Sequence, residues 1–116
     1  MSEAVTHALP DEPYIAIATM TVVPARRADF LRAMEMVMKQ SAREEGLISF
    51  QLVANRQDPN IFTAVDVFRD RAAYDTHLQM PYTGQLVAQL DGCLVGEAAS
   101  TFHHQISTDV SCRAKI

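Results

Sequence analysis

A chain of 116 residues is long enough for one domain with a single hydrophobic core, and its 48% hydrophobic and 21% charged residues are ordinary for a globular protein. The formal net charge of −4, with basic residues scattered apart from the Arg26-Arg27 pair, argues against a nucleic-acid-binding protein, because phosphate binding needs clustered Lys and Arg. No apolar run approaches the ~20 residues of a membrane span, and the first residues lack a secretory signal, so we expect a cytoplasmic protein without a membrane partner.

The first predicted element is a strand that follows an amino-terminal arm. Prolines and acidic residues crowd the end of segment 1–13, which is therefore expected to be flexible. The stretch "YIAIATMTVV", residues 14–23, is unbroken and rich in β-branched residues, which indicates a strand. Pro24 then opens a predicted helix, and Gly46 follows its last turn, where we expect a left-handed cap. The apolar stripe of this helix comprises Phe30, Leu31, Met34, Val37 and Met38.

A predicted hairpin follows the first helix. Residues 47–55, "LISFQLVAN", and residues 61–68, "IFTAVDVF", both have the composition of strands. The five residues between them, "RQDPN", are typical of a turn. The two strands should therefore pair with each other.

The second helical region is predicted to be interrupted. Asp70 has the chemistry of an N-cap, and a helix should follow from Arg71. Pro81 breaks this helix and restarts it as a second segment, which Gly92 closes. Residues 99–107 form the last predicted strand. The apolar side of the second segment is expected to comprise Leu86, Val87 and Leu90.

The order of these elements is β-α-β-β-α-β. This is the pattern of a ferredoxin-like α+β fold, a four-stranded antiparallel sheet with helices on one face. We expect one domain over residues 14–108 and a tail over residues 109–116. Cys93 and Cys112 have no paired spacing, so without a secretory signal we expect free thiols in a reducing cytoplasm rather than a disulfide.

Both faces of the predicted sheet are apolar. In the strand at 61–68, Phe62 and Ala64 point one way while Val65 and Val67 point the other. Helices can cover only one face, and a face in water would show alternating polar residues. An uncovered apolar sheet would be a large aggregation-prone patch. The sequence therefore predicts a homodimer in which two sheets meet face to face.

Asp66 is the first candidate for acid-base chemistry. It shares a strand face with Phe62 and Phe68, where a carboxylate is costly unless it is paired or hydrogen-bonded. Burial would raise its pKa and make it a useful acid or base. The alternative is that Asp66 lies near the strand end and forms a structural ion pair with Arg69 or Arg71.

His77 is the second candidate. By i, i+4 spacing, Tyr74, Leu78 and Pro81 define the inner side of its helix. His77 lies on the flank, about sixty degrees from Tyr74, and can point into a crevice between helix and sheet. There, His77 and Asp66 would orient each other as a base and its holder do. The alternative is a partly exposed histidine that caps a backbone group.

A metal site is not expected. His103 and His104 are adjacent on a strand and face opposite ways, so they cannot ligate one ion from the same side. No other ligand stands at metal spacing beside them.

The segments "TVVPARRADFLRAM" and "EEGLISFQLVANRQDPNIFTAVDVFRDRAAYDTHLQMPY" resemble the antibiotic biosynthesis monooxygenase (ABM) family of dimeric α/β barrels, which includes small quinol monooxygenases. The resemblance runs from about Tyr14 to Ile106. Two departures concern the family's usual Glu and Trp on the third strand, which are Asp66 and Phe68 here, and a third is Tyr82, where the family often has His. The positions that serve haem in the haem-degrading branch fall near Thr19, Phe68 and Val87, so the resemblance implies no haem chemistry.

The resemblance implies a monooxygenase that uses no metal, flavin or other cofactor. A quinol, phenol or anthrone-type substrate is deprotonated, and its anion reacts with oxygen directly. His77 or Asp66 would take the proton, and Thr19 and Ser49 would bind oxygen atoms. The slot for a flat ring would comprise Phe50, Phe62, Phe68, Tyr74 and Tyr82. Two alternatives stay open: a non-catalytic small-molecule-binding or structural dimer, and an isomerase on the same barrel.

Overall fold

The computed structural model describes residues 12–106, and its element order confirms the predicted β-α-β-β-α-β pattern. The second helical region is split at Pro81, as expected. In chain order the elements are β1 (Tyr14–Thr21), the short 3-10 helix η1 (Pro24–Arg26), α1 (Arg27–Ser41), β2 (Leu47–Ala54), β3 (Ile61–Phe68), α2 (Arg71–Leu78), α3 (Pro81–Gln89) and β4 (Ala99–His104). The predicted arm over 1–13 lies mostly outside the described residues, and the tail over 109–116 with Cys112 lies wholly outside them.

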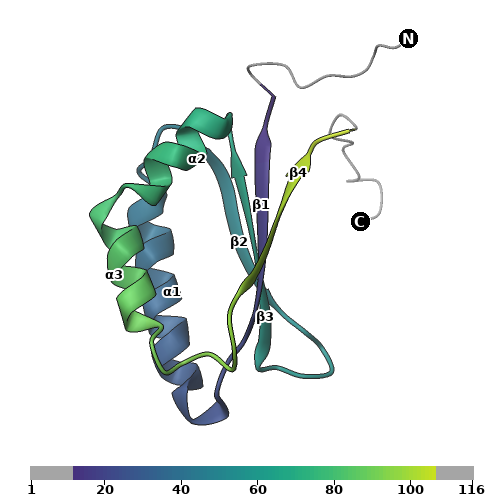
Figure 1. Cartoon of the computed structure of the whole chain (residues 1–116), viewed down its shortest axis with the longest axis vertical. Helices are drawn as coiled ribbons and strands as arrows, with labels where there is room; N and C mark the ends of the chain where they lie inside the picture. The colour runs from purple at the N-terminus through teal and green to yellow at the C-terminus, as the bar shows by residue number, and fades with distance from the viewer. Residues whose placement is uncertain (1–11, 107–116) are drawn as a thin grey trace, which may run out of the picture.

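The four strands form one antiparallel sheet in the order β2-β3-β1-β4. Helices α1, α2 and α3 all lie on the same side of this sheet (Figure 1). The confirmed hairpin of β2 and β3 has an irregularity between Leu47 and Ser49. Its turn is held by Asn55, whose side-chain oxygen accepts hydrogen bonds from the backbone N–H groups of Gln57 and Asp58. No helix within residues 12–106 has the length and hydrophobicity needed to cross a membrane.

The core lies between α1 and the helix-facing side of the sheet. From the predicted stripe of α1, Phe30, Met34 and Val37 are buried, while Leu31 and Met38 are partly buried against them. On the sheet they meet Met20, Phe62 and Ala64. The helical spacing of these apolar residues is therefore sufficient to explain which face of α1 turns inward.

Two details of the later helices differ from the sequence expectation. The Asp70 carboxylate caps α2 as predicted, accepting from the Ala73 N–H at 2.8 Å. However, Leu78 is 50% exposed, because Ala73 and His77 rather than Leu78 occupy the buried side of α2. On α3, Leu86 packs against the core but Val87 is 70% exposed, since α3 rests on α1 by a narrower face than the sequence indicated.

Gly46 is needed for space rather than for a left-handed backbone. Of the glycines in the described chain, Gly92 and Gly96 have a positive φ, so the left-handed cap predicted at Gly46 is wrong. A Cβ on Gly46 would lie 2.4 Å from the Cβ of Ala73 on α2. The Gly46 carbonyl also accepts a hydrogen bond of 2.7 Å from the Arg69 N–H. The turn after α1 is thus pressed directly against the start of α2.

The sheet face that points away from the helices is largely apolar. The register places Ile15 and Ile17 of β1 beside Val67 and Val65 of β3, on the side opposite to Asp66 and Phe68. Val53 on β2 belongs to the same face and is 44% exposed. No element within residues 12–106 covers this face (Figure 1).

Candidate functional site

Three polar side chains meet from three different segments, namely the turn after α1, helix α2 and helix α3. The Nδ1 atom of His77 on α2 lies 2.8 Å from Oε2 of Glu44, in the turn after α1. The hydroxyl of Tyr82 on α3 donates to the same Glu44 oxygen. The side chains of His77 and Glu44 are only 9% and 6% exposed. An ionisable pair this deeply buried makes this cluster the first candidate for acid-base chemistry.

The hydrogen bond from the His77 ring to Glu44 determines which ring nitrogen of His77 carries a proton. A carboxylate can only accept, so the His77 nitrogen that faces it carries the proton. The other ring nitrogen, Nε2, makes no hydrogen bond to any residue within 12–106. In the neutral form of His77, Nε2 is therefore the nitrogen with a free lone pair, and the buried ring is not the partly exposed capping residue of the alternative interpretation.

Asp66 lies on the helix-facing side of β3, in register with Ala16 of β1 and Phe50 of β2. Its burial raises the pKa of the carboxyl from 3.8 to about 6; the His77 ring opposes this rise and the Glu44 carboxylate adds to it. The Asp66 Oδ1 atom is buried and has no hydrogen-bond partner among the described residues. A carboxyl with this pKa changes its protonation state close to neutral pH.

Asp66 does not take part in the ion pairs considered from the sequence. Arg69 pairs with Asp70 at 3.7 Å, and Arg71 pairs with Asp75 at 3.9 Å. The carboxylate that holds His77 is Glu44, not Asp66. Asp66 and His77 nevertheless influence each other electrostatically, so both groups lie in one region of the interior.

Tyr82 is held in its protonated form. Burial, followed by its hydrogen bond to Glu44, raises the pKa of the phenol to about 12. The buried hydroxyl of Ser41 lies close enough to lower that pKa somewhat, although it makes no hydrogen bond of ordinary geometry. At neutral pH, Tyr82 is therefore a permanent hydrogen-bond donor to Glu44.

Aromatic rings surround this polar cluster. Phe68 is fully buried, with ring centroids 5.2 Å from His77 and 5.5 Å from Tyr74. Tyr74 continues the aromatic surface to Tyr14 at 5.1 Å and to Phe102 at 5.5 Å. Phe102 is 48% exposed on the edge strand β4, so this surface runs from the interior to the solvent.

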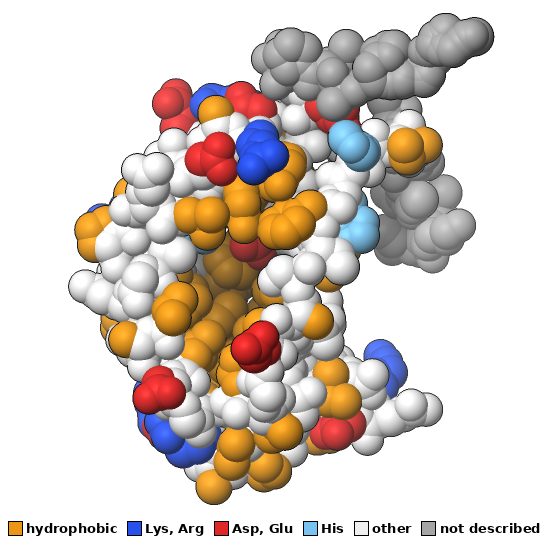
Figure 2. Space-filling view, viewed as in Figure 1, with side chains coloured by type: hydrophobic (Ala, Val, Ile, Leu, Met, Phe, Trp, Pro, Cys, Tyr) orange, Lys and Arg blue, Asp and Glu red, His pale blue; other side chains and the backbone are white. Residues whose placement is uncertain are grey.

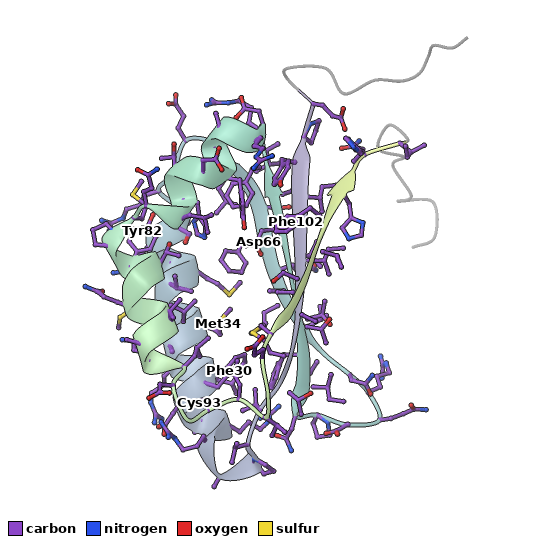
Figure 3. The ribbon with its side chains drawn as sticks, in the orientation of Figure 1. Phe30, Met34, Asp66, Tyr82, Cys93 and Phe102 are labelled. Atoms are coloured by element: carbon purple, nitrogen blue, oxygen red, sulfur yellow. The ribbon has the colours of Figure 1, made fainter. Side chains whose placement is uncertain are left out.

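The molecule is hollowed between the helices and β4. Figure 2 shows that the walls of this hollow are mainly hydrophobic and that an acidic side chain lies inside it. In the same orientation, Figure 3 labels Asp66 in this space, with Tyr82 on the helix side and Phe102 on the sheet side. The hollow thus combines apolar walls with the Asp66 carboxyl.

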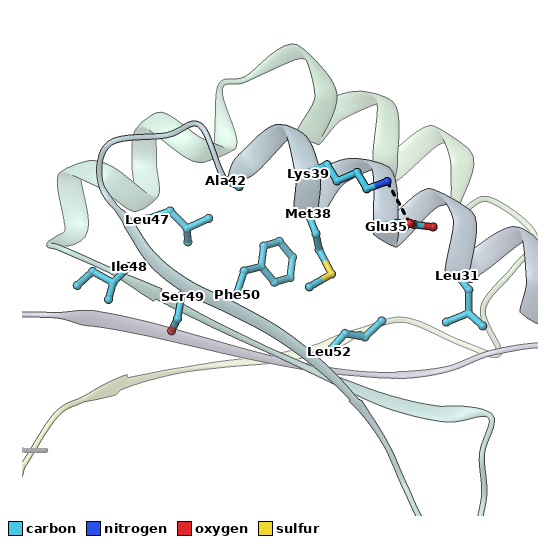
Figure 4. Close-up of a pocket in the computed structure, with 10 residues that line it drawn as sticks. All are labelled: Leu31, Glu35, Met38, Lys39, Ala42, Leu47, Ile48, Ser49, Phe50 and Leu52. Carbon is cyan, nitrogen blue, oxygen red and sulfur yellow. Dashed lines mark ion pairs between the residues drawn. The ribbon is translucent and has the colours of Figure 1, made fainter. Parts of the chain in front are cut away.

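A second concavity, of about 680 Å³, lies between α1 and β2, at the other edge of the sheet from the hollow beside β4 (Figure 4). Within it Phe50 points toward α1, whereas Ser49 points away from α1. Phe50 is also the register neighbour of Asp66 on β3, on the same side of the sheet. The lining residues are Leu31, Glu35, Met38, Lys39, Ala42, Leu47, Ile48, Ser49, Phe50 and Leu52.

The structure brings some of the predicted site residues together and separates others. His77, Phe68, Tyr74 and Tyr82 lie in one cluster of contacts that borders Asp66. The predicted residues Phe50 and Ser49 line the α1–β2 concavity instead.

Two predicted residues lie elsewhere for simple geometric reasons. Thr19 is exposed on the face of β1 that points away from the helices, because side chains alternate along a strand. Phe62 stacks with Phe30 at 4.8 Å in the hydrophobic core, four residues along β3 from Asp66. Neither side chain reaches the cluster around His77.

Glu44 is the residue that sequence reasoning missed. It is separated from His77 by 33 positions, and in the sequence it is one of two adjacent acidic residues at the end of a helix. A negative charge near the carboxyl end of a helix interacts unfavourably with the helix dipole. This indicates that another group stabilises the Glu44 carboxylate. That group is the His77 ring together with the Tyr82 hydroxyl.

The histidines of β4 lie apart from this cluster. In the register, His103 pairs with Ile15 and His104 with Tyr14, so the two face opposite sides of the sheet. His103 Nε2 is 2.7 Å from the Thr101 hydroxyl, and His104 contacts Glu12. Within residues 12–106 no three His, Cys, Asp or Glu side chains converge as metal ligands would.

Residues 13–89 match the antibiotic biosynthesis monooxygenase family, which is well over half of the chain. The chain belongs to this family. The solved structure of a family member described as antibiotic biosynthesis monooxygenase superposes with a TM-score of 0.76 at 18% identity, covering 81% of this chain and 99% of the other. The Mycobacterium tuberculosis protein Rv0793 superposes with a TM-score of 0.79 at 20% identity, covering 84% and 99%. The Pseudomonas aeruginosa protein PA3566 gives 0.77 at 20% identity, covering 86% and 100%.

At these identities the solved structures establish the ABM fold but not the reaction. A curated relative, the uncharacterized protein sll1783 of Synechocystis, is 30% identical over 77 residues. These residues are 66% of this chain and 52% of that protein, so the chain spans about half the length of the relative. The predicted ferredoxin-like fold and the family resemblance are both confirmed.

Proposed function

We propose that the protein is a cofactor-independent monooxygenase that oxidises a small, flat aromatic substrate, such as a quinol, phenol or anthrone, with molecular oxygen. The observation that carries this proposal is the buried His77–Glu44 pair beside Asp66, within aromatic walls. Membership of the ABM family supports the same class of reaction.

The chemistry needs a base, a dry apolar slot and a group that returns a proton. The substrate's acidic O–H or C–H gives its proton to Nε2 of His77, and the resulting anion transfers an electron to oxygen. The two radicals combine to a peroxide, which loses water and leaves one oxygen atom on the substrate carbon. Asp66, with its pKa of about 6, is suited to supply a proton to the departing oxygen. Tyr74 and Phe102 form the surface against which a flat ring would stack, and the fully buried Phe68 supports Tyr74 from the interior.

Oxygen consumption tests this proposal directly. Chelator-treated protein without added flavin is mixed with a series of quinols and anthrones, and dissolved oxygen and product are measured. For an anthrone we expect one oxygen molecule consumed per quinone formed, with water as the second product and no accumulation of hydrogen peroxide. A folded protein that consumes no oxygen with any member of the series, yet binds some of them, would instead support the non-catalytic binding dimer.

We also propose that two copies associate through the sheet faces that point away from the helices. The support is the apolar face formed by Ile15, Ile17, Val65 and Val67, which no described element covers. In this dimer the two sheets would form one closed barrel, with the hollow between the helices and β4 of each copy on opposite outer sides.

The buried, free thiol of Cys93 fits a reducing compartment such as the cytoplasm.

Sedimentation at micromolar concentration should therefore give about twice the 12.9 kDa mass of one chain. Ile17→Glu, which puts a charge in the middle of the proposed interface, should shift the protein to monomers or prevent its folding. Val87→Glu on the exposed side of α3 is the matched control and should sediment as wild type. A well-folded wild-type monomer at this concentration would contradict the proposed interface.

A further inference from the structure

The position of the Glu44 carboxylate determines which nitrogen of His77 can accept a proton from a substrate. The Glu44 side chain is 6% exposed, and its Oε2 atom accepts hydrogen bonds from both the His77 Nδ1 atom and the Tyr82 hydroxyl. A buried carboxylate is costly unless it is hydrogen-bonded, and here two donors converge on it. The carboxylate is thus fixed from two sides, by α2 and by α3.

The backbone around Glu44 restricts its position further. The Glu44 N–H donates to the Ser41 carbonyl at 2.9 Å, and the Leu47 N–H donates to the Glu44 carbonyl at 3.2 Å. Two residues later, Gly46 lies against Ala73, one helical turn before His77 on α2. The contact between Gly46 and Ala73 therefore sets the separation of the two segments that carry Glu44 and His77.

We propose that Glu44 is a positioning residue for His77: its carboxylate, held in place by Tyr82, keeps the imidazole proton on Nδ1 and leaves Nε2 as the atom that takes a proton from substrate. This inference rests on the proposed function for its catalytic meaning, but the tautomer it requires is a property of the resting protein. Without a partner, a neutral histidine carries its proton on either nitrogen, so only part of the population would have Nε2 free. The Glu44 charge also stabilises the positive charge that the ring gains when it accepts a proton.

The inference is tested first by nuclear magnetic resonance on protein with isotope-labelled histidine. The nitrogen shifts and the couplings to ring hydrogens distinguish a protonated Nδ1 from a protonated Nε2. At a pH where the ring is neutral, we expect the proton of His77 on Nδ1 in the wild-type protein. In Glu44→Leu, which keeps the bulk but removes the acceptor, we expect a mixture of both tautomers. Wild-type His77 with its proton on Nε2 would overturn the inference.

Conservative variants separate positioning from a merely structural contact. Glu44→Asp retains the carboxylate and should keep the Nδ1 tautomer and part of the turnover, whereas Glu44→Gln should lower kcat by about 10²-fold with little change in KM. Tyr82→Phe leaves the His77–Glu44 bond in place and should lower kcat less than Glu44→Gln does. The exposed neighbour provides the matched control, since Glu45→Gln should change neither tautomer nor turnover. If Glu44→Leu does not fold, the wild-type spectrum and the Glu44→Gln and Glu44→Asp pair still decide the matter.

The two proposals fail in different ways. A wild-type protein with the Nδ1 tautomer that is lost in Glu44→Leu supports the positioning role even if no substrate consumes oxygen. Oxygen consumption that is unchanged in Glu44→Gln, or that proceeds with the Nε2 tautomer, overturns the positioning role and leaves the monooxygenase proposal intact.

Discussion

Replacing His77 by Ala should lower turnover of the correct substrate by roughly 10²-fold or more, because the group that takes the substrate proton is lost. His77→Gln is the more informative change: its amide can still donate to Glu44, so the buried carboxylate keeps a partner, but it cannot act as a base. Both variants should be compared with wild type by oxygen uptake under saturating substrate, after their folding has been verified by thermal unfolding.

The matched control is His104→Gln, at a histidine whose side chain is 68% exposed on β4. It should retain wild-type turnover. Because His77 and Glu44 are expected to act as a unit, the double variant His77→Gln/Glu44→Gln should lose no more turnover than His77→Gln alone. Normal oxygen consumption by His77→Gln would end the catalytic interpretation of this residue.

Asp66→Asn should change how the stability of the protein depends on pH. The folded-state pKa of Asp66 is raised from 3.8 to about 6, so the folded protein holds this proton more tightly than the unfolded chain does. Burial of the ionised Asp66 carboxylate lowers the free energy of unfolding. This loss is absent below pH 4, grows between pH 4 and 6, and is complete above that range. A rise of this size corresponds to ~3 kcal/mol in the free energy of unfolding.

Relative to wild type, Asp66→Asn should therefore gain up to ~3 kcal/mol of stability between pH 4 and pH 8, as measured by denaturant unfolding at several pH values. Asp75→Asn, the same substitution at an exposed position of α2, is the matched control and should not reproduce this change. A stability difference between Asp66→Asn and wild type that stays constant from pH 4 to pH 8 would show that Asp66 is not desolvated in solution.

The fold could be predicted because its determinants are local. Residues 61–68, with a β-branched residue at every second position, coincide with β3, and Asp70 caps α2 as its side-chain chemistry requires. Pro81 divides the helical region for the same kind of reason, since its ring is tolerated only in a first helical turn. Such effects act within a few residues and can be read from one sequence.

The site was only partly predictable because its determinants are contacts between distant segments. His77 and Asp66 stood out as polar residues in apolar surroundings, but nothing local indicates that His77 meets Glu44. The same limit applies to Gly46, whose need for space comes from Ala73 on another helix and not from its own backbone angles. Thr19 was misplaced because the orientation of a strand's two faces depends on where the helices pack.

The contact of Gly46 with Ala73 has a consequence for anyone who wishes to alter the substrate range of this protein. Phe50 and Met38 line the open α1–β2 concavity, which lies outside the proposed substrate hollow, so larger residues there have room and need not disturb Glu44. At position 46, by contrast, even one methyl group would wedge the turn away from α2 and so pull Glu44 from His77. In a randomised library, position 46 should therefore stay glycine in every active clone, although it touches no substrate.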